Sequence, residues 1–247
     1  MTARPKAPAR NLLTRPPQPP GASDASTTAP HSGAASTELE ALRQDATAVG
    51  LALPDAAFDR LIAYLALLRK WNAAYNLTAV RDAAQMRVQH LADCLAVIAP
   101  LRRERGSSPQ RLLDVGSGGG LPGVVLAIAE PLWDVSCVDT VGKKAAFIRQ
   151  VGGELALPNL HALHARVESL SGPPFDVITS RAFSSLPDSV RLTRPLLAPS
   201  GVWMAMKGRR PDSELAALLS DIDVFHVEPL AVPGLDAERC LIWMRPR

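Results

Sequence analysis

The residues whose types and spacing best suit chemistry are the glycines between Asp114 and Gly123, in the run Asp-Val-Gly-Ser-Gly-Gly-Gly-Leu-Pro-Gly. They stand where a buried run at 111–115 gives way to a helical pattern that begins at Pro122. Glycine adopts positive φ and leaves no Cβ in the way of a ligand. The free N–H groups of the following helix would face that ligand. A tight loop without a ligand has the same composition, so the glycines alone leave both interpretations open.

Two carboxylates favour the interpretation that the glycine loop binds a nucleotide. Asp139 ends the next predicted strand, where it can accept hydrogen bonds from both hydroxyls of a ribose. Asp114 precedes the glycines, within reach of the amino-acid end of S-adenosylmethionine. A dinucleotide fingerprint needs Gly or Ala at the place that, counted from Gly116 and Gly118, holds Leu121. There is also no G-x-x-x-x-G-K-S/T, which excludes a P-loop. We therefore predict S-adenosylmethionine as the cofactor and not NAD.

Further candidate residues follow later strands of the predicted sheet. Val167 and Glu168 come after the third strand, Arg181 after the fourth and Lys207 after the fifth. Because the ligand crevice of an open parallel sheet lies beyond the carboxyl ends of its strands, Val167 would pack on an adenine and the two cations would orient a substrate. The basic run 207–210 suits phosphate contacts with a nucleic acid. The alternative is that Arg181 and Lys207 are solvated charges at strand ends.

The elements that position these residues alternate between strand and helix. We expect strands at 111–115, 134–138, 160–164, 176–179 and 202–206, and helices at 122–130, 143–157 and 186–197. Strands that alternate with helices form a parallel sheet with right-handed crossovers. The last two strands, 224–232 and 239–244, are linked too closely for a crossover helix and must form an antiparallel hairpin. This α/β arrangement is typical of the Rossmann-like sheet of class I methyltransferases.

Two segments precede this methyltransferase domain, which we place at 109–247. Residues 1–36 are rich in proline and nearly free of large apolar side chains, which predicts a disordered tail. An organelle transit peptide is the alternative. Residues 37–108 are predicted to form a helical region that ends in a turn-rich stretch at 102–110. Apolar spacing and a capping residue at Asp82 predict its helices at 39–49, 54–71 and 82–98.

The composition fits a cytoplasmic protein. The net charge of +3 and pI near 9.0 are compatible with a nucleic-acid partner. No apolar run is long enough to span a bilayer. Cys94, Cys137 and Cys240 are scattered, which predicts buried thiols and neither disulfides nor a metal site. We expect a monomer that uses no metal and contacts no membrane.

The absence of two motifs narrows the acceptor. Methyltransferases that act on exocyclic amines carry N/D-P-P-Y/F after the fourth strand, where this chain has Ser-Arg-Ala-Phe at 180–183. Enzymes that methylate pyrimidine C5 need a cysteine nucleophile, often followed by proline, and none of the three cysteines has that neighbour. An acceptor that is already nucleophilic remains, such as guanine N7, whose lone pair carries no proton. No general base is then expected, and positioning would be the main contribution.

These segments together resemble the bacterial small-subunit ribosomal RNA guanine-N7 methyltransferase family (RsmG, formerly GidB), from Phe58 to Trp243. The resemblance is carried by the Lys-Trp-Asn-Ala-Ala-Tyr-Asn-Leu-Thr run at 70–78, by the glycine run, and by Ser-Arg-Ala at 180–182, Lys-Gly at 207–208 and Glu-Arg at 238–239. It implies methyl transfer to a guanine in the decoding-region hairpin of 16S rRNA, within the small ribosomal subunit. The positions that match the family's cofactor contacts are Gly116, Leu121, Val167, Glu168 and Arg181.

The chain departs from the family at one motif. Where the family has R-H-x-x-D-S, this chain has Gln89-His90-Leu91-Ala92-Asp93-Cys94, which puts in doubt an RNA contact at Gln89. His90 and Asn76 are further candidates for orienting the substrate. Their structural alternatives are a His90–Asp93 hydrogen bond one turn apart and a helix cap at Asn76. Trp71 and Tyr75, four residues apart on one helical face, would either pack in the core or form a base-stacking platform at the domain junction.

Two other functions stay open. A small-molecule methyltransferase on the same fold would have a closed apolar pocket lined by the helical region. A nucleotide-binding regulator or assembly factor would hold RNA without catalysing a reaction on it.

Overall fold

The computed structural model describes residues 31–247. Most of the predicted tail therefore lies outside the described residues. The first helix, α1, already begins at His31, inside the segment assigned to that tail. No helix among residues 31–247 is both long and apolar enough to cross a membrane.

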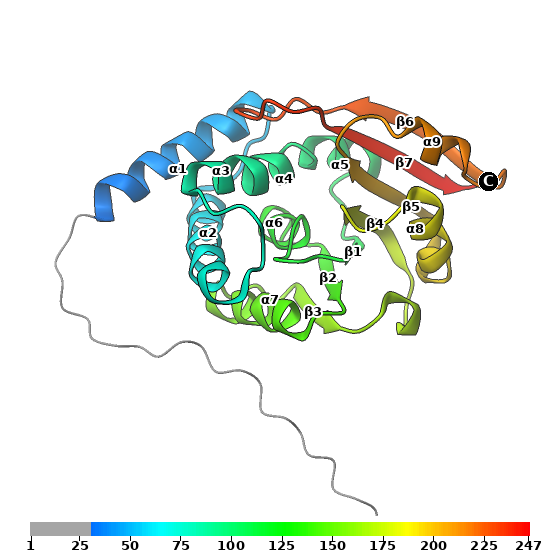
Figure 1. The fold of residues 1–247 in the computed structure, drawn as a ribbon, viewed down its shortest axis with the longest axis horizontal. Coiled ribbons are helices and arrows are strands. Elements are labelled where there is room, and N and C mark those ends of the chain that lie inside the picture. Colours follow the sequence, from blue (N-terminus) through cyan, green and yellow to red (C-terminus); the bar gives the residue numbers. More distant parts are fainter. Residues whose placement is uncertain (1–30) are drawn as a thin grey trace, which may run out of the picture.

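One seven-stranded sheet organises the chain, in the order β3-β2-β1-β4-β5-β7-β6 (Figure 1). The strands are β1 (Arg111–Val115), β2 (Asp134–Asp139), β3 (Leu160–His164), β4 (Phe175–Arg181), β5 (Leu197–Lys207), β6 (Ile222–Pro229) and β7 (Cys240–Pro246). The first five run parallel, while β7 lies antiparallel to both β5 and β6. The predicted class I methyltransferase fold with its terminal hairpin is confirmed.

The helices cover both faces of the sheet. They are α1 (His31–Ala48), α2 (Asp55–Tyr75), α3 (Ala83–Met86), α4 (Asp93–Leu95), α5 (Ile98–Arg105), α6 (Gly123–Ala129), α7 (Gly142–Glu154), α8 (Leu186–Thr193) and α9 (Asp212–Ala216), with a π-helical turn η1 (Arg87–Ala92) and 3-10 turns η2 (Val167–Ser169) and η3 (Arg194–Leu196). Alternate strand residues enter different cores: Leu112 packs in the core that contains α6 and α7, and Leu113 in the core that contains α8.

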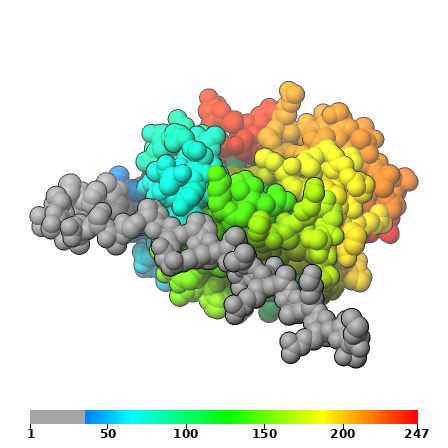
Figure 2. All heavy atoms as spheres, turned by 60° about the horizontal axis from the view of Figure 1, so that its bottom comes forward, coloured from blue at the N-terminus to red at the C-terminus, as the bar shows by residue number. Residues whose placement is uncertain are grey.

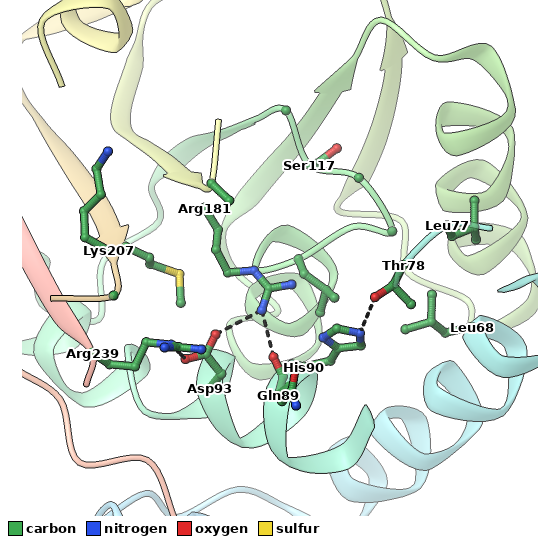
Figure 3. A pocket seen from close by; sticks show the side chains of 17 residues that line it. Leu68, Leu77, Thr78, Gln89, His90, Asp93, Ser117, Arg181, Lys207 and Arg239 are labelled. Atoms are coloured by element: carbon green, nitrogen blue, oxygen red, sulfur yellow. Dashed lines mark hydrogen bonds and ion pairs between the residues drawn. The ribbon is translucent and has the colours of Figure 1, made fainter. Parts of the chain in front are cut away.

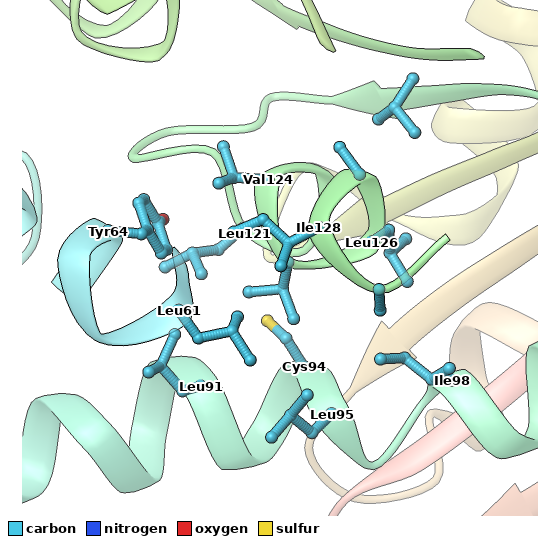
Figure 4. Close-up of a cluster of buried hydrophobic side chains, with 14 of the residues drawn as sticks. Leu61, Tyr64, Leu91, Cys94, Leu95, Ile98, Leu121, Val124, Leu126 and Ile128 are labelled. Atoms are coloured by element: carbon cyan, nitrogen blue, oxygen red, sulfur yellow. The ribbon is translucent and has the colours of Figure 1, made fainter. Parts of the chain in front are cut away.

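The predicted helical region packs into the same core as the sheet domain. Leu61 of α2 and Leu95 of α4 lie against Leu121 and Ile128 around α6 (Figure 4). Viewed from below, this region and the sheet domain form one continuous surface (Figure 2). The hydroxyl of Tyr64 donates to the carbonyl of Gly119 over 2.7 Å. The helices therefore support the glycine loop directly.

Two local predictions need correction, and one short helix was missed. The expected third helix does begin at Asp82, whose carboxylate accepts from the Gln85 N–H over 2.8 Å, but it is interrupted by the π-helical turn η1. The stretch expected to be turn-rich from residue 102 is helical as far as Arg105. The short helix α9 was not predicted. Trp71 packs in the core, with its ring centroid 5.0 Å from that of Tyr75.

Candidate active site

The glycine loop joins β1 to α6 and presents backbone to a cavity. At Gly118 the φ angle is 59°, and an added Cβ would meet nothing nearer than 4.0 Å. Any other residue would therefore be strained there and would fill the open space in front of the loop. Gly123 has the opposite role, because a Cβ there would collide with the Cys137 Sγ of β2.

Gly123 is therefore the residue that lets α6 approach the sheet. The spacing Gly118-x-Gly120-x-x-Gly123 matches the dinucleotide fingerprint, so the argument against a dinucleotide from Leu121 does not hold. Leu121 is buried and lies on the wall of a cavity instead. The terminal hairpin remains the feature of this fold that argues for a methyltransferase.

The first of two adjoining cavities, here called the sheet cavity, has a volume of about 400 Å³. It brings together four predicted cofactor residues, Gly116, Asp139, Val167 and Glu168. The buried Asp139 carboxylate accepts from the N–H groups of Gly118 (3.0 Å) and Val141 (2.8 Å). The remaining lone pairs of its two oxygens can still accept from hydroxyls. The strand ends thus place a fixed carboxylate beside an apolar wall.

Asp114 does not join them. Its side chain is fully buried behind the loop and accepts from the Gly123 N–H over 2.9 Å, while its other oxygen is buried without a partner. Burial raises the pKa of this carboxyl to about 7. Asp114 lines neither this cavity nor the one that adjoins it, and its expected contact with the amino-acid end of the cofactor stays a prediction. In this structure the residue stabilises the start of α6.

The second cavity, here called the junction cavity, has a volume of about 450 Å³ and lies between the helical region, the glycine loop and the hairpin (Figure 3). Two arginines from distant segments converge on Asp93, which is 1 % exposed. Arg181 at the end of β4 donates to one carboxylate oxygen over 3.0 Å. Arg239, beside β7, donates to the other over 2.9 Å. Gly116 and Ala182 line both cavities, which therefore adjoin.

The π-helical turn η1 explains a second contact of Arg181. In an α-helix the Asp93 N–H would bond to the carbonyl of Gln89, four residues back. Here it bonds to Val88 O, five residues back. Arg181 donates to Gln89 O instead, over 2.9 Å. Because this contact uses backbone, the departure from the family's arginine at position 89 leaves it intact. Turns of this kind often mark functional sites.

His90 lies in the junction cavity, and the hydrogen bond to Asp93 that was the structural alternative for it is not formed. Its Nε2 pairs with Thr78 Oγ over 2.9 Å, and both Asp93 oxygens are already bonded to arginines. Its Nδ1 is buried without a partner. Burial lowers the pKa of this imidazole to about 4. His90 is therefore neutral at physiological pH.

The other two candidates for orienting a substrate are placed differently from expectation. Lys207 lines the junction cavity, but its ammonium bonds to Glu214 (2.8 Å) and to Ser184 O (3.0 Å). Its charge is therefore neutralised within the protein. Asn76 is exposed and ends α2 in the left-handed conformation, with φ 50°. The cap interpretation holds for Asn76, and Thr78 lines the cavity in its place.

Sequence reasoning assigned no function to Thr78, Asp93, Ser117 and Arg239, which also line this cavity. They appeared as parts of motifs, and Asp93 also as a possible partner of His90, since nothing in the spacing pairs Asp93 with arginines so far along the chain. All three cysteines are buried and free, as predicted. Among residues 31–247 no group of three or more His, Cys, Asp or Glu side chains could hold a metal ion.

The sheet order and the crevice at its carboxyl edge define a class I methyltransferase. Solved structures with this fold include TrmN from Thermus thermophilus, at TM-score 0.52 and 18% identity over 85% of this chain and 78% of that one. Another is the 1,6-didemethyltoxoflavin-N1-methyltransferase of Burkholderia thailandensis, at TM-score 0.53 and 17% identity over 74% of this chain and 89% of that one, solved with bound S-adenosylhomocysteine.

Sequence comparison gives the family. The model for rRNA small subunit methyltransferase G matches residues 58–242. The ribosomal RNA small subunit methyltransferase G of Leptothrix cholodnii is 64% identical over 85% of this chain and 96% of its own length. That of Methylibium petroleiphilum is 62% identical over 83% and 93%. The chain belongs to this family, and the resemblance found in its motifs is confirmed.

Proposed function

We propose that this protein transfers a methyl group from S-adenosylmethionine to N7 of a specific guanine in 16S ribosomal RNA. The observation that carries the proposal is the meeting of two different cavities at Gly116 and Ala182. One offers a carboxylate and an apolar wall, as a nucleoside requires. The other offers arginines, as a nucleic acid requires. Family membership supplies the class of RNA.

The residues of the sheet cavity fit the adenosine part of the cofactor. Asp139 would accept from the ribose hydroxyls, and the buried Val167 would pack on the adenine. The open space in front of Gly118 fits the part of the molecule that runs toward the junction cavity. When bound there, S-adenosylmethionine supplies an electrophilic methyl group on its sulfonium.

The junction cavity would hold the acceptor base. Guanine N7 carries no proton, so the site needs to position the ring and not to deprotonate it. The neutral His90, with its pKa lowered to about 4, fits this requirement because it offers no charged acid. Arg181 and Arg239 would donate toward guanine O6 while N7 faces the methyl group. Their ion pairs with Asp93 hold both guanidinium groups in fixed places.

The two alternative functions agree less well with the residues that line the junction cavity. A small-molecule methyltransferase would need a closed apolar pocket, whereas the junction cavity carries Arg181, Lys207 and Arg239. A non-catalytic RNA-binding factor would keep its role in cells after Arg181→Ala, while a methyltransferase would lose it. The monomeric state stays a prediction.

The decisive experiment incubates the purified protein with methyl-labelled S-adenosylmethionine and either naked 16S rRNA or small ribosomal subunits. Mass spectrometry of the digested RNA then locates the label. We expect one 7-methylguanosine, and the two substrates together show whether the acceptor is the free RNA or the assembled subunit. Label on an exocyclic amine, or on no RNA, would overturn the proposal.

A further inference from the structure

A third cavity of about 480 Å³ lies beside the junction cavity. Its walls come from the loop after β5 and from the two hairpin strands with the loop between them. Gly208 and Arg239 line both cavities, so this one, here called the hairpin cavity, continues the junction cavity outward.

The walls of the hairpin cavity combine apolar and cationic surface. Val227, Pro229 and Leu230 form an apolar side. Three arginines, Arg209, Arg210 and Arg239, line the cavity together with one carboxylate, Glu238. Such a combination suits a nucleotide, because RNA bases stack on guanidinium planes and apolar surfaces while arginines contact phosphates.

The three arginines differ in how free they are. Arg239 is held by Asp93, and Arg210 pairs with Asp212 over 2.7 Å. Arg209 is exposed and has no ion pair with any of the residues 31–247. Its guanidinium is therefore the one that can turn to a ligand without breaking a bond inside the protein.

We propose that the hairpin cavity binds the nucleotide next to the methylated guanine, with Arg209 on its phosphate. This inference rests on the proposed RNA substrate and extends it to a second base. With the target base in the junction cavity, the chain of a single strand continues past the shared wall at Gly208 and Arg239. Arg239 enters the junction cavity from the side of the hairpin (Figure 3), so it would lie between the two bases.

The test uses Arg209→Glu, since an exposed side chain without an ion pair can be changed without unfolding the protein. Binding to a fluorescein-labelled transcript of the 16S decoding-region hairpin is measured by anisotropy at several salt concentrations. We expect the Kd to rise about tenfold for Arg209→Glu. For Arg209→Ala we expect the slope of log Kd against log salt concentration to fall by about one, which corresponds to one released counterion fewer. The affinity for S-adenosylhomocysteine should not change.

The matched control is Arg149→Glu, an exposed arginine on α7, beside β3 at the opposite edge of the sheet. Equal weakening by Arg149→Glu and Arg209→Glu would overturn the inference, because it would mean a general charge effect. An unchanged Kd for Arg209→Glu would overturn it as well.

A second measurement locates the contact. 4-Thiouridine placed on either side of the methylated guanine is photo-cross-linked to the wild-type protein, and the linked peptide is identified by mass spectrometry. We expect a cross-link within 208–210 or 227–240 from one of the two positions. Cross-links only to other segments would overturn the inference. The proposed function fails separately, if the wild type labels no guanine N7.

Discussion

The sheet cavity and the junction cavity adjoin, but they are built in different ways. The carboxylate of Asp139 in the sheet cavity bonds to the backbone of Gly118 and Val141, both within the first two strand–helix units. In the junction cavity, Asp93 bonds to Arg181 and Arg239, which are 88 and 146 residues further along the chain. The carboxylate of the sheet cavity is thus held by residues close to it in the sequence, whereas that of the junction cavity is held only when distant parts of the fold meet.

The difference distinguishes a cavity formed by the strand ends of the common fold from one that also needs the helical region and the hairpin. The sheet cavity, which we propose holds the cofactor, lies at the carboxyl ends of the strands, where open α/β sheets bind their ligands. The junction cavity needs the helical region and the hairpin, which here lie against the glycine loop. We infer that acceptor specificity resides in the junction cavity, so changes to the two cavities should have separable effects.

The largest effect should come from Arg181→Ala. Arg181 lines the junction cavity and not the sheet cavity. We therefore expect the rate of methyl transfer to fall about 1,000-fold, as it does when a positioned donor is lost from other active sites. The Kd for S-adenosylhomocysteine, measured by calorimetry, should stay within about threefold. Arg181→Lys keeps the charge but not the planar fork, and should be intermediate. A parallel loss of rate and cofactor affinity would place Arg181 in the cofactor site, as the family resemblance implies.

Asp139→Ala should give the converse result. Two charge-assisted hydrogen bonds to a ribose would be lost, so we expect the affinity for S-adenosylhomocysteine to fall about 100-fold. At saturating cofactor, transfer to RNA should be less affected. Asp139→Asn retains an acceptor and serves as the milder variant. If Asp139→Ala lowered the affinity for RNA and not that for S-adenosylhomocysteine, the assignment of separate roles to the two cavities would be wrong.

The same difference explains how much could be predicted from the sequence. The alternation of strands and helices predicted the sheet and its hairpin. It also predicted the place of Asp139, which ends β2, and of Val167 and Glu168, which follow β3. Arg239 and Thr78 could not be found in this way, since their place depends on packing between distant segments. The contact of Gln89 O with Arg181 depends on a π-helical turn, for which the sequence carries no known signal.

Asp93→Asn tests whether the junction cavity is held together by its ion pairs. Without the buried Asp93 charge, Arg181 and Arg239 would lose their ion-pair partner. Because their side chains are 23 % and 24 % exposed, we expect the free energy of unfolding to fall by about 2 kcal/mol. Urea denaturation measures it. The control is Asp221→Asn, whose pair with Arg194 is exposed and should contribute nothing measurable. Equal effects would show that Asp93 is no more than a surface partner.

The smallest effect concerns His90 and pH. The folded imidazole takes up a proton only near pH 4, while the unfolded one does so near 6.5, so the unfolded state binds more protons between these values. The contribution of His90 to stability is therefore present above pH 6.5 and lost as the pH falls toward 4.

Between pH 7.5 and 5.5 the wild type should lose about 1 kcal/mol more stability than His90→Gln. The raised pKa of Asp114 acts in the opposite direction, but it is common to both proteins and cancels in the difference. Urea denaturation at the two pH values measures the difference, and a value independent of pH would contradict the burial of a neutral ring. The rate of methyl transfer should show no step near pH 6.5, because guanine N7 carries no proton that His90 would have to remove.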